Sequence, residues 1–337
     1  MKKLFVGIFC FRMVTLLSQD IHISQFWVSP VSINPASAGF FDGNIRIGAY
    51  NRTQWRSITK AYQTAGASID LPVVKRPGKQ DMFGFGVMMD YDQAGDSKYT
   101  TMQGNLLFSY ARAINSRNNN FLMGGISFGG GQRSWSYSQL QFDEQFQNGM
   151  FNPDIGNSET YYGNNYWFAD MGMGVQWFYQ PGFLDFYQVG FSVYHLNKPR
   201  ISMLKDDDIR LPIKWVSHAI VSIEVHPDIA VMPVMYFAVQ QKYREFLLGG
   251  IYAHSLPIDV KGFINKAKIG LFYRWNDAFY LAFGMDWRRL TFSISYDFNV
   301  SKLVKASQAR GGVEIIVSCI IKKKQYIKRK AIPCSVF

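Results

Sequence analysis

Hydrophobic residues alternate with small or polar residues over three successive segments in the last third of the chain. In Ala267–Trp275 every odd position is apolar or aromatic, whereas the even positions are Lys268, Gly270, Phe272 and Arg274. Phe279–Trp287 and Leu290–Phe298 repeat the pattern. A period of two places successive side chains on opposite faces of an extended chain. Each segment is therefore predicted to be a β-strand with one apolar face.

The opposite face of these strands mixes small residues with charged ones. Gly270 and Ser295 share it with Asp286, as expected where side chains crowd inside a closed wall. Aromatic residues close the apolar face near the strand ends: Trp275, Trp287 and Tyr296. Such a belt is typical of a membrane–water boundary. The pattern predicts part of a transmembrane β-barrel.

Similar alternation recurs along most of the chain. Further strands are predicted near residue 45 and at 61–71, 82–92, 99–113, 120–132, 165–179, 185–195, 213–226, 229–241, 246–253 and 312–321. The sum is about fourteen, and an even number brings both ends of a barrel to the same side of the membrane. We predict an all-β fold: an antiparallel transmembrane β-barrel over residues 45–321.

The connections support this order. With periplasmic termini, the outward loops include 132–163, 196–211 and 299–311, whereas the inward turns include 227–228 and 288–289. Long outer loops and short inner turns are the expected asymmetry. Two inner connections, 75–79 and 254–263, are longer; they are candidate contacts for periplasmic partners, although ordinary variation in loop length explains them as well.

Composition narrows the class of membrane protein. Aromatic residues make up 16% of the 337 residues and 29 residues are glycine, yet the mean hydropathy is only -0.08. Beyond the N-terminus no run of about 18 apolar residues occurs, which excludes a helical membrane protein. A barrel distributes its hydrophobic residues by alternation instead.

The two ends of the chain differ from the predicted barrel. Residues 1–18 read as a signal peptide, with Lys2 and Lys3 before an apolar stretch and cleavage predicted after Ser18. Residues 19–44 contain Ser29-Pro30 and Asn34-Pro35, which favour an irregular segment, folded back in the periplasm or the lumen. Residues 322–337 form a basic periplasmic tail. The mature protein is expected to be exported.

No constellation for catalysis is evident, and the protein is not expected to be an enzyme. The five histidines are scattered, and no cysteine completes a metal site, so neither a metal nor another cofactor is predicted. Gly129–Gly131 resembles a phosphate loop but lacks its lysine, which favours close packing. Cys319 and Cys334 are not expected to form a disulfide, and an exported barrel does not meet nucleic acid.

Two groups of residues are candidates for partner docking. The tail carries six positive charges: Lys322, Lys323, Lys324, Lys328, Arg329 and Lys330. They could pair with phosphates of the inner leaflet or with a partner protein, or simply be solvated. Arg52, Gln54 and Trp55 form the second group, a predicted loop motif. Its alternative interpretation is a belt tryptophan beside a lumen arginine.

Short motifs along the mature chain resemble one known family, the PorP/SprF outer-membrane proteins of type IX secretion. In the first half they are QFWVSPVSINPASAG at 25–39, RTQW at 52–55, SIDLP at 68–72, DYDQAG at 90–95 and LQFDEQF at 140–146. In the second half they are VYHLNKP at 193–199, YRWNDA at 273–278, SYDFNVSKL at 295–303, GGVE at 311–314 and the closing residues 332–337.

The resemblance implies an outer-membrane component of the type IX secretion system of Bacteroidota. It further implies as partners the periplasmic ring, peptidoglycan-linked proteins and a dedicated secreted adhesin with a C-terminal signal domain, in gliding motility or adhesion. Outer-membrane lipid is expected as a further partner from the apolar outer face and the basic tail. The residues themselves leave a second function open, a channel or transporter for a small solute. Selective conductance would favour transport, and loss of one surface adhesin on deletion would favour secretion.

Overall fold

The computed structural model of the chain describes residues 20–54, 56, 61–75, 81–95, 98–135, 143–147, 150–152, 165–182, 184–201, 209–256, 265–301 and 304–322. The predicted signal peptide, Trp55 and the tail beyond Lys322 lie outside these residues. The two longer inner connections, 75–79 and 254–263, also lie outside these residues, except for residues 75 and 254–256, which belong to strands.

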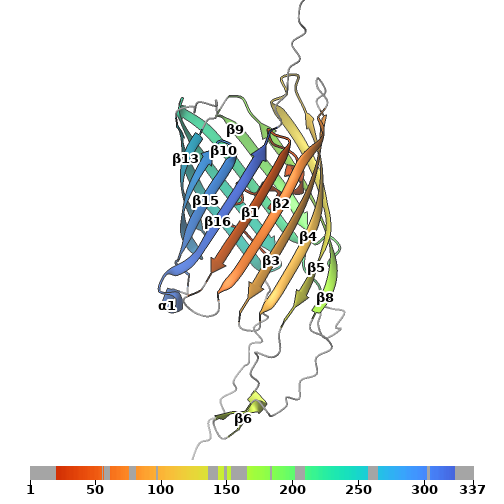
Figure 1. Cartoon of the computed structure of the whole chain (residues 1–337), viewed down its shortest axis with the longest axis vertical. Coiled ribbons are helices and arrows are strands. Elements are labelled where there is room, and N and C mark those ends of the chain that lie inside the picture. The colour runs from red at the N-terminus through yellow and green to blue at the C-terminus, as the bar shows by residue number, and fades with distance from the viewer. Residues whose placement is uncertain are drawn as a thin grey trace, which may run out of the picture.

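Fourteen antiparallel strands close into one barrel (Figure 1). They are β1 (Ile45–Gln54), β2 (Tyr62–Lys75), β3 (Asp81–Ala94), β4 (Tyr99–Ala113), β5 (Asn120–Ser134), β8 (Asn165–Tyr179), β9 (Phe186–Tyr194), β10 (Lys214–His226), β11 (Ile229–Gln240), β12 (Tyr243–Leu256), β13 (Asn265–Arg274), β14 (Ala278–Trp287), β15 (Leu290–Asn299) and β16 (Arg310–Ile321). The predicted fold is confirmed.

Closure depends on the pairing of the first strand with the last. Ile45 lies opposite Ile321 and Gln54 opposite Gly312, in an unbroken register. A closed sheet leaves no backbone edge to be desolvated by lipid. Among the described residues, no helix is long and apolar enough to span a membrane.

The alternation read from the sequence is an alternation of outer wall and lumen. In β14 every odd residue from Phe279 to Trp287 is at least partly exposed, whereas Ala278, Tyr280 and Ala282 are buried. Cys319 follows the same rule on β16 and is a free thiol on the outward side. The large apolar side chains on the outside are those that lipid would cover.

Aromatic residues on the outer wall mark two levels. On β8, Trp167 lies near one end of the strand and Trp177 near the other, both pointing outward. The ten residue steps between them cover about 33 Å of strand. At a strand tilt of about 40°, this is roughly the 25 Å height of the apolar band of such barrels.

The two ends of the barrel differ. The short elements outside the wall, β6 (Phe146–Gln147), β7 (Met150–Phe151), η4 (Asp143–Gln145) and α1 (Val304–Ser307), lie at one end, which we call the loop end. Strand β1 begins and strand β16 ends at the opposite end, which we call the terminus end (Figure 1).

Residues 20–44 lie inside the barrel and are called the lumen segment. Two short 3-10 helices, η1 (Pro30–Ser32) and η2 (Pro35–Ser37), are its regular structure. Asn34 caps η2, because its side-chain oxygen accepts the N–H of Ala36. Phe26, Asn34 and Ala36 are buried against wall residues. The lumen is therefore occupied by the chain's own N-terminal part.

Candidate functional site

The lumen segment is bound to the wall by a carboxylate of the last strand. Glu314 of β16 accepts the backbone N–H of Ser24 at 2.8 Å and that of Gln25 at 2.9 Å, one on each oxygen. The Gln25 side chain also donates to Ser295 Oγ at 3.0 Å. These backbone groups have no strand or helix partner, so the carboxylate satisfies donors that would otherwise be buried unpaired.

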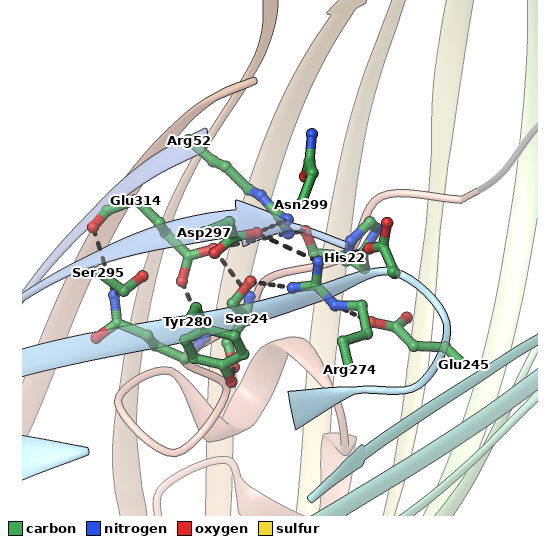
Figure 2. A network of polar contacts seen from close by, with 12 residues as sticks. His22, Ser24, Arg52, Glu245, Arg274, Tyr280, Ser295, Asp297, Asn299 and Glu314 are labelled. Carbon is green, nitrogen blue, oxygen red and sulfur yellow. Dashed lines mark hydrogen bonds and ion pairs between the residues drawn. The ribbon is translucent and has the colours of Figure 1, made fainter. Parts of the chain in front are cut away.

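Two arginines and three carboxylates surround this anchor (Figure 2). Arg52 contacts Asp297 at 3.0 Å and Glu314 at 3.8 Å, and Arg274 contacts Asp297 at 3.2 Å and Glu245 at 3.2 Å. All five side chains are less than 5% exposed. Buried charges of this kind persist only when they are paired, so the cluster is a structural unit of the lumen.

The same cluster holds the backbone and side chain of one serine. Arg274 donates to Ser24 Oγ, and the Tyr280 hydroxyl donates to the Ser24 carbonyl at 2.9 Å. Figure 2 shows Ser24 between these two residues and Glu314. Strands β13, β14 and β16 thereby fix a single point of the lumen segment.

A second charged cluster holds the start of the lumen segment at the loop end. The Asp20 carboxylate contacts Lys214 Nζ at 3.0 Å and His195 Nε2 at 3.3 Å, and the other ring nitrogen of His195 lies 2.9 Å from Asp170. Burial alone would lower the pKa of His195, but the carboxylates of Asp20 and Asp170 raise that pKa to about 9. His195 is therefore a cation at neutral pH and bridges the segment to the wall.

A third contact lies toward the terminus end. Arg46 forms a two-pronged ion pair with Asp70, with N–O distances of 2.9 and 2.8 Å. Asp70 also accepts the N–H of Gly39 at 2.7 Å, and Arg46 donates to the Ser37 carbonyl at 3.1 Å. One ion pair of the wall thus holds both ends of the turn that follows η2.

Between these polar anchors the lumen segment packs through aromatic rings. Trp27 stacks on Phe272 at 4.5 Å between centroids, and Phe272 stacks on Tyr280 at 4.6 Å. Phe26 packs beside Tyr236 at 5.3 Å. Such contacts add to the burial of apolar area, so the segment is held along its length.

Glycines of the wall make room for the backbone of the segment. A Cβ atom on Gly125 would lie 2.5 Å from the carbonyl carbon of Pro35, and one on Gly84 would lie 2.7 Å from the carbonyl carbon of Ala38. Gly39 itself has a φ of +68°, which favours glycine. No larger residue fits these lumen positions unless the segment moves.

A cavity of about 430 Å³ remains at the terminus end beside the segment. Aromatic and amide side chains line it, among them Phe40, Phe121, Phe178 and Gln176. Asp42 and Arg46 contribute charges to its rim. Asp42 also pairs with Lys322 at 2.5 Å, which ties the end of the last strand to the lumen segment.

The structure places the sequence-predicted docking residues in different environments. Arg52 and Gln54 belong to β1, so their assignment to a loop was wrong: the alternation of β1 continues to Gln54, and Arg52 is only 1% exposed in the lumen. Lys322 is half-exposed and pairs with Asp42. Trp55, Lys323, Lys324, Lys328, Arg329 and Lys330 lie outside the described residues.

The other members of the Arg52 cluster were not predicted from the sequence. Asp297, Glu314 and Arg274 each lie on the small or polar face of a predicted strand, which was a visible signal. Nothing local pairs them, because Arg52 and Asp297 are 245 residues apart. In the described part of the chain, no group of three His, Cys, Asp or Glu side chains could hold a metal ion. Gly129–Gly131 lie within β5, in the wall.

A closed fourteen-stranded wall around a bound N-terminal segment defines a transmembrane β-barrel with an occupied lumen. The chain belongs to the family of type IX secretion system membrane proteins PorP/SprF, whose model matches residues 15–319. Fold and family together point to the outer membrane. No curated protein matches the sequence.

Solved barrels share the fold. The toluene transporter TbuX of Ralstonia pickettii is 9% identical with a TM-score of 0.51, over 86% of this chain and 92% of that one. The toluene transporter TodX of Pseudomonas putida is also 9% identical with a TM-score of 0.51, over 89% of this chain and 94% of that one. At this identity the likeness concerns the fold alone.

Proposed function

We propose that the protein is a non-enzymatic outer-membrane component of the type IX secretion system. It supports secretion and surface attachment of a dedicated large adhesin that carries a C-terminal signal domain, in adhesion or gliding motility. The observation that carries this proposal, beside the family, is the lumen segment. Three sets of ion pairs hold the segment in the lumen, which favours a rigid, closed barrel over an open pore.

The charged residues of the lumen support a structural role rather than catalysis. Arg52, Arg274, Asp297 and Glu314 bind one another or the segment, so their hydrogen-bonding capacity is used within the protein. A catalytic pair needs a reactive group with room for a substrate beside it. The cluster offers no such group.

Periplasmic partners would meet the terminus end. The Asp42–Lys322 pair and the rim of the 430 Å³ cavity are on that side, and the basic tail begins there. An aromatic pocket with a charged rim has the composition of protein docking sites. We therefore propose that ring and peptidoglycan-linked proteins contact this mouth and the tail, together with inner-leaflet phosphates.

Deletion of the gene in the parent bacterium tests the proposal. We expect one large surface adhesin to disappear from the cell surface while uptake of small solutes is unchanged. Complementation with the full chain should restore the adhesin. Unchanged display of every surface protein would refute the secretion role.

Removal of residues 322–337 tests the partner contacts. We expect the truncated chain, purified in detergent from the parent bacterium, to recover about tenfold less of the periplasmic partners in a pull-down, because several ionic contacts are lost together. A chain with Arg288→Gln and Arg289→Gln, at another turn of the same mouth, is the control. Undiminished recovery would mean that the charges of the tail are solvated and do not bind these partners.

The alternative function is a channel for a small solute. The cavity favours it, because an aromatic pocket at one mouth could admit an apolar molecule, and the barrels of similar fold are named as toluene transporters. Reconstituted protein with a steady, solute-selective conductance would favour this function. We expect no such conductance, because the lumen segment occupies the path.

A further inference from the structure

The outer wall carries a groove at the loop end, at the seam where the barrel closes. Three neighbouring strands each contribute one outward side chain to it: Thr53 of β1, Val313 of β16 and Tyr296 of β15. Val313 pairs with Thr53 on one side and with Tyr296 on the other, so the three form one row across the seam. The groove has a volume of about 440 Å³.

Two arginines complete this groove. Arg310 is the first residue of β16, and Arg56 follows β1 by two residues; both line the groove beyond the row of three. Neither guanidinium forms an ion pair within the described part of the chain. The groove therefore combines an apolar and hydroxyl-bearing floor with two cations.

The carboxylates of β15 and β16 near the groove point into the lumen. The register of β15 and β16 shifts between Tyr296 and Phe298, and Asp297 at this irregularity faces the lumen, where it binds Arg52. Glu314 also faces the lumen. On the outward positions of β1, β15 and β16 no acidic residue occurs. Within the described residues of these three strands, the positive charge of the groove therefore meets no carboxylate on the outward side.

The height of the groove fits the headgroup layer. Tyr296 belongs to the loop-end aromatic level, and the arginines lie at or past the strand ends, beyond the apolar band. At that level the free-energy cost of an arginine on the outer wall is small, and its guanidinium group can reach a lipid phosphate. With the terminus end in the periplasm, the loop end meets the outer leaflet.

We propose that this groove binds the phosphorylated headgroup of an outer-leaflet glycolipid. The guanidinium groups of Arg56 and Arg310 hold the phosphate, for which planar, two-pronged donors are suited. The Thr53 hydroxyl is placed to bond the sugar, and Tyr296 and Val313 contact its apolar side. The assignment rests on the outer-membrane location and is separate from the choice of secreted client.

Binding of fluorescent lipid A to the purified full chain in a non-ionic detergent tests this site. We expect Arg56→Gln with Arg310→Gln to weaken binding by at least about tenfold, the equivalent of one charge-assisted contact. The matched control, Arg288→Gln with Arg289→Gln, removes the same charge at the opposite mouth and should bind like the unmodified chain. Arg56→Lys with Arg310→Lys should keep part of the affinity.

Competition identifies the ligand chemistry. Dephosphorylated lipid A and phosphatidylglycerol should compete at least about tenfold less well than lipid A, because one lacks the phosphate and the other the sugar. Equal competition by phosphatidylglycerol, or undiminished binding by the double glutamine variant, would overturn the proposal. Thermal unfolding checks that each variant is folded, and adhesin display is scored separately, so failure here leaves the secretion proposal to its own test.

Discussion

A single histidine joins the start of the lumen segment to the wall. His195 lies just past β9 with a φ of +60°, and its ring contacts Asp20 on one side and Asp170 on the other. Because the two carboxylates come from distant parts of the chain, the charge of this ring strengthens the contact among all three groups and adds to the ion pair of Asp20 with Lys214.

The raised pKa of His195 predicts a pH-dependent contact. A folded-state pKa of about 9 lies above the ordinary 6.5, so the stabilisation is fully present below pH 6.5 and is lost as pH rises through about 9. We expect amide hydrogen exchange at residues 20–25, corrected for its intrinsic pH dependence, to accelerate between pH 7 and pH 10. His195→Gln should abolish that step; a step that persists in the variant would assign it to another group.

Arg52 shows which features of a single residue could be predicted from the sequence and which could not. The lumen position of Arg52 followed from the alternation of β1 once that strand was known to reach Gln54. Its partners could not be predicted, because they depend on closure of the barrel, which places β1 beside β16, with β15 as the next strand. Periodicity gives the face on which a side chain lies, and only the three-dimensional fold gives the side chain that it meets.

At the scale of elements, the wall and the lumen segment are fitted to each other through glycine. The neighbours Gly124 and Gly125 of β5 offer a matched pair. A Cβ atom on Gly125 would collide with Pro35 and Ala36, whereas one on Gly124 would meet nothing within 4 Å. The two positions are consecutive in one strand, so Gly124 faces the outer wall and Gly125 faces the lumen, and only Gly125 meets the segment.

We therefore predict opposite outcomes for two alanine substitutions. Gly125→Ala should displace η2 and lower stability by about 1–3 kcal/mol, the usual effect of overpacking. Gly124→Ala should leave stability unchanged or slightly higher. Thermal unfolding in detergent and hydrogen exchange at residues 33–39 measure both effects. Equal behaviour of the two variants would contradict the close fit.

The elements were predictable to different degrees. Strands β4 and β8 matched their predicted bounds, because strong alternation runs to both ends. Strand β12 extends from Tyr243 to Leu256, beyond the predicted 246–253, since pairing with long neighbours continues after the pattern weakens. The prolines predicted an irregular segment before β1, but not which side of the wall it would occupy, because that depends on contacts with β4, β5 and β8.

At the scale of the whole molecule, the secretion proposal requires the lumen segment to stay in place. Asn34 and Gly174 of β8 allow a covalent test, since a Cβ atom on Gly174 would lie 2.9 Å from the Asn34 Cγ atom. Two cysteines at these positions would be within the reach of a disulfide. The bond would fix the segment to the wall.

We predict that Asn34→Cys with Gly174→Cys, in a chain with Cys319→Ser, supports adhesin display equally in oxidised and reduced form. The reduced form is the control for the substitutions themselves. Display that fails only in the oxidised form would mean that the segment must move during secretion. Separation by gel electrophoresis without reductant reports the fraction cross-linked.

The bond between Ser24 and Glu314 has a consequence for how the molecule is made. These residues are 290 positions apart, and the strand that carries Glu314 is also the one that seals the wall against β1. We therefore expect the lumen segment to enter the nascent barrel before, or at the moment when, the last strand pairs with β1. An assembly factor that delivers this polypeptide to the membrane has to keep its beginning within reach until its end arrives.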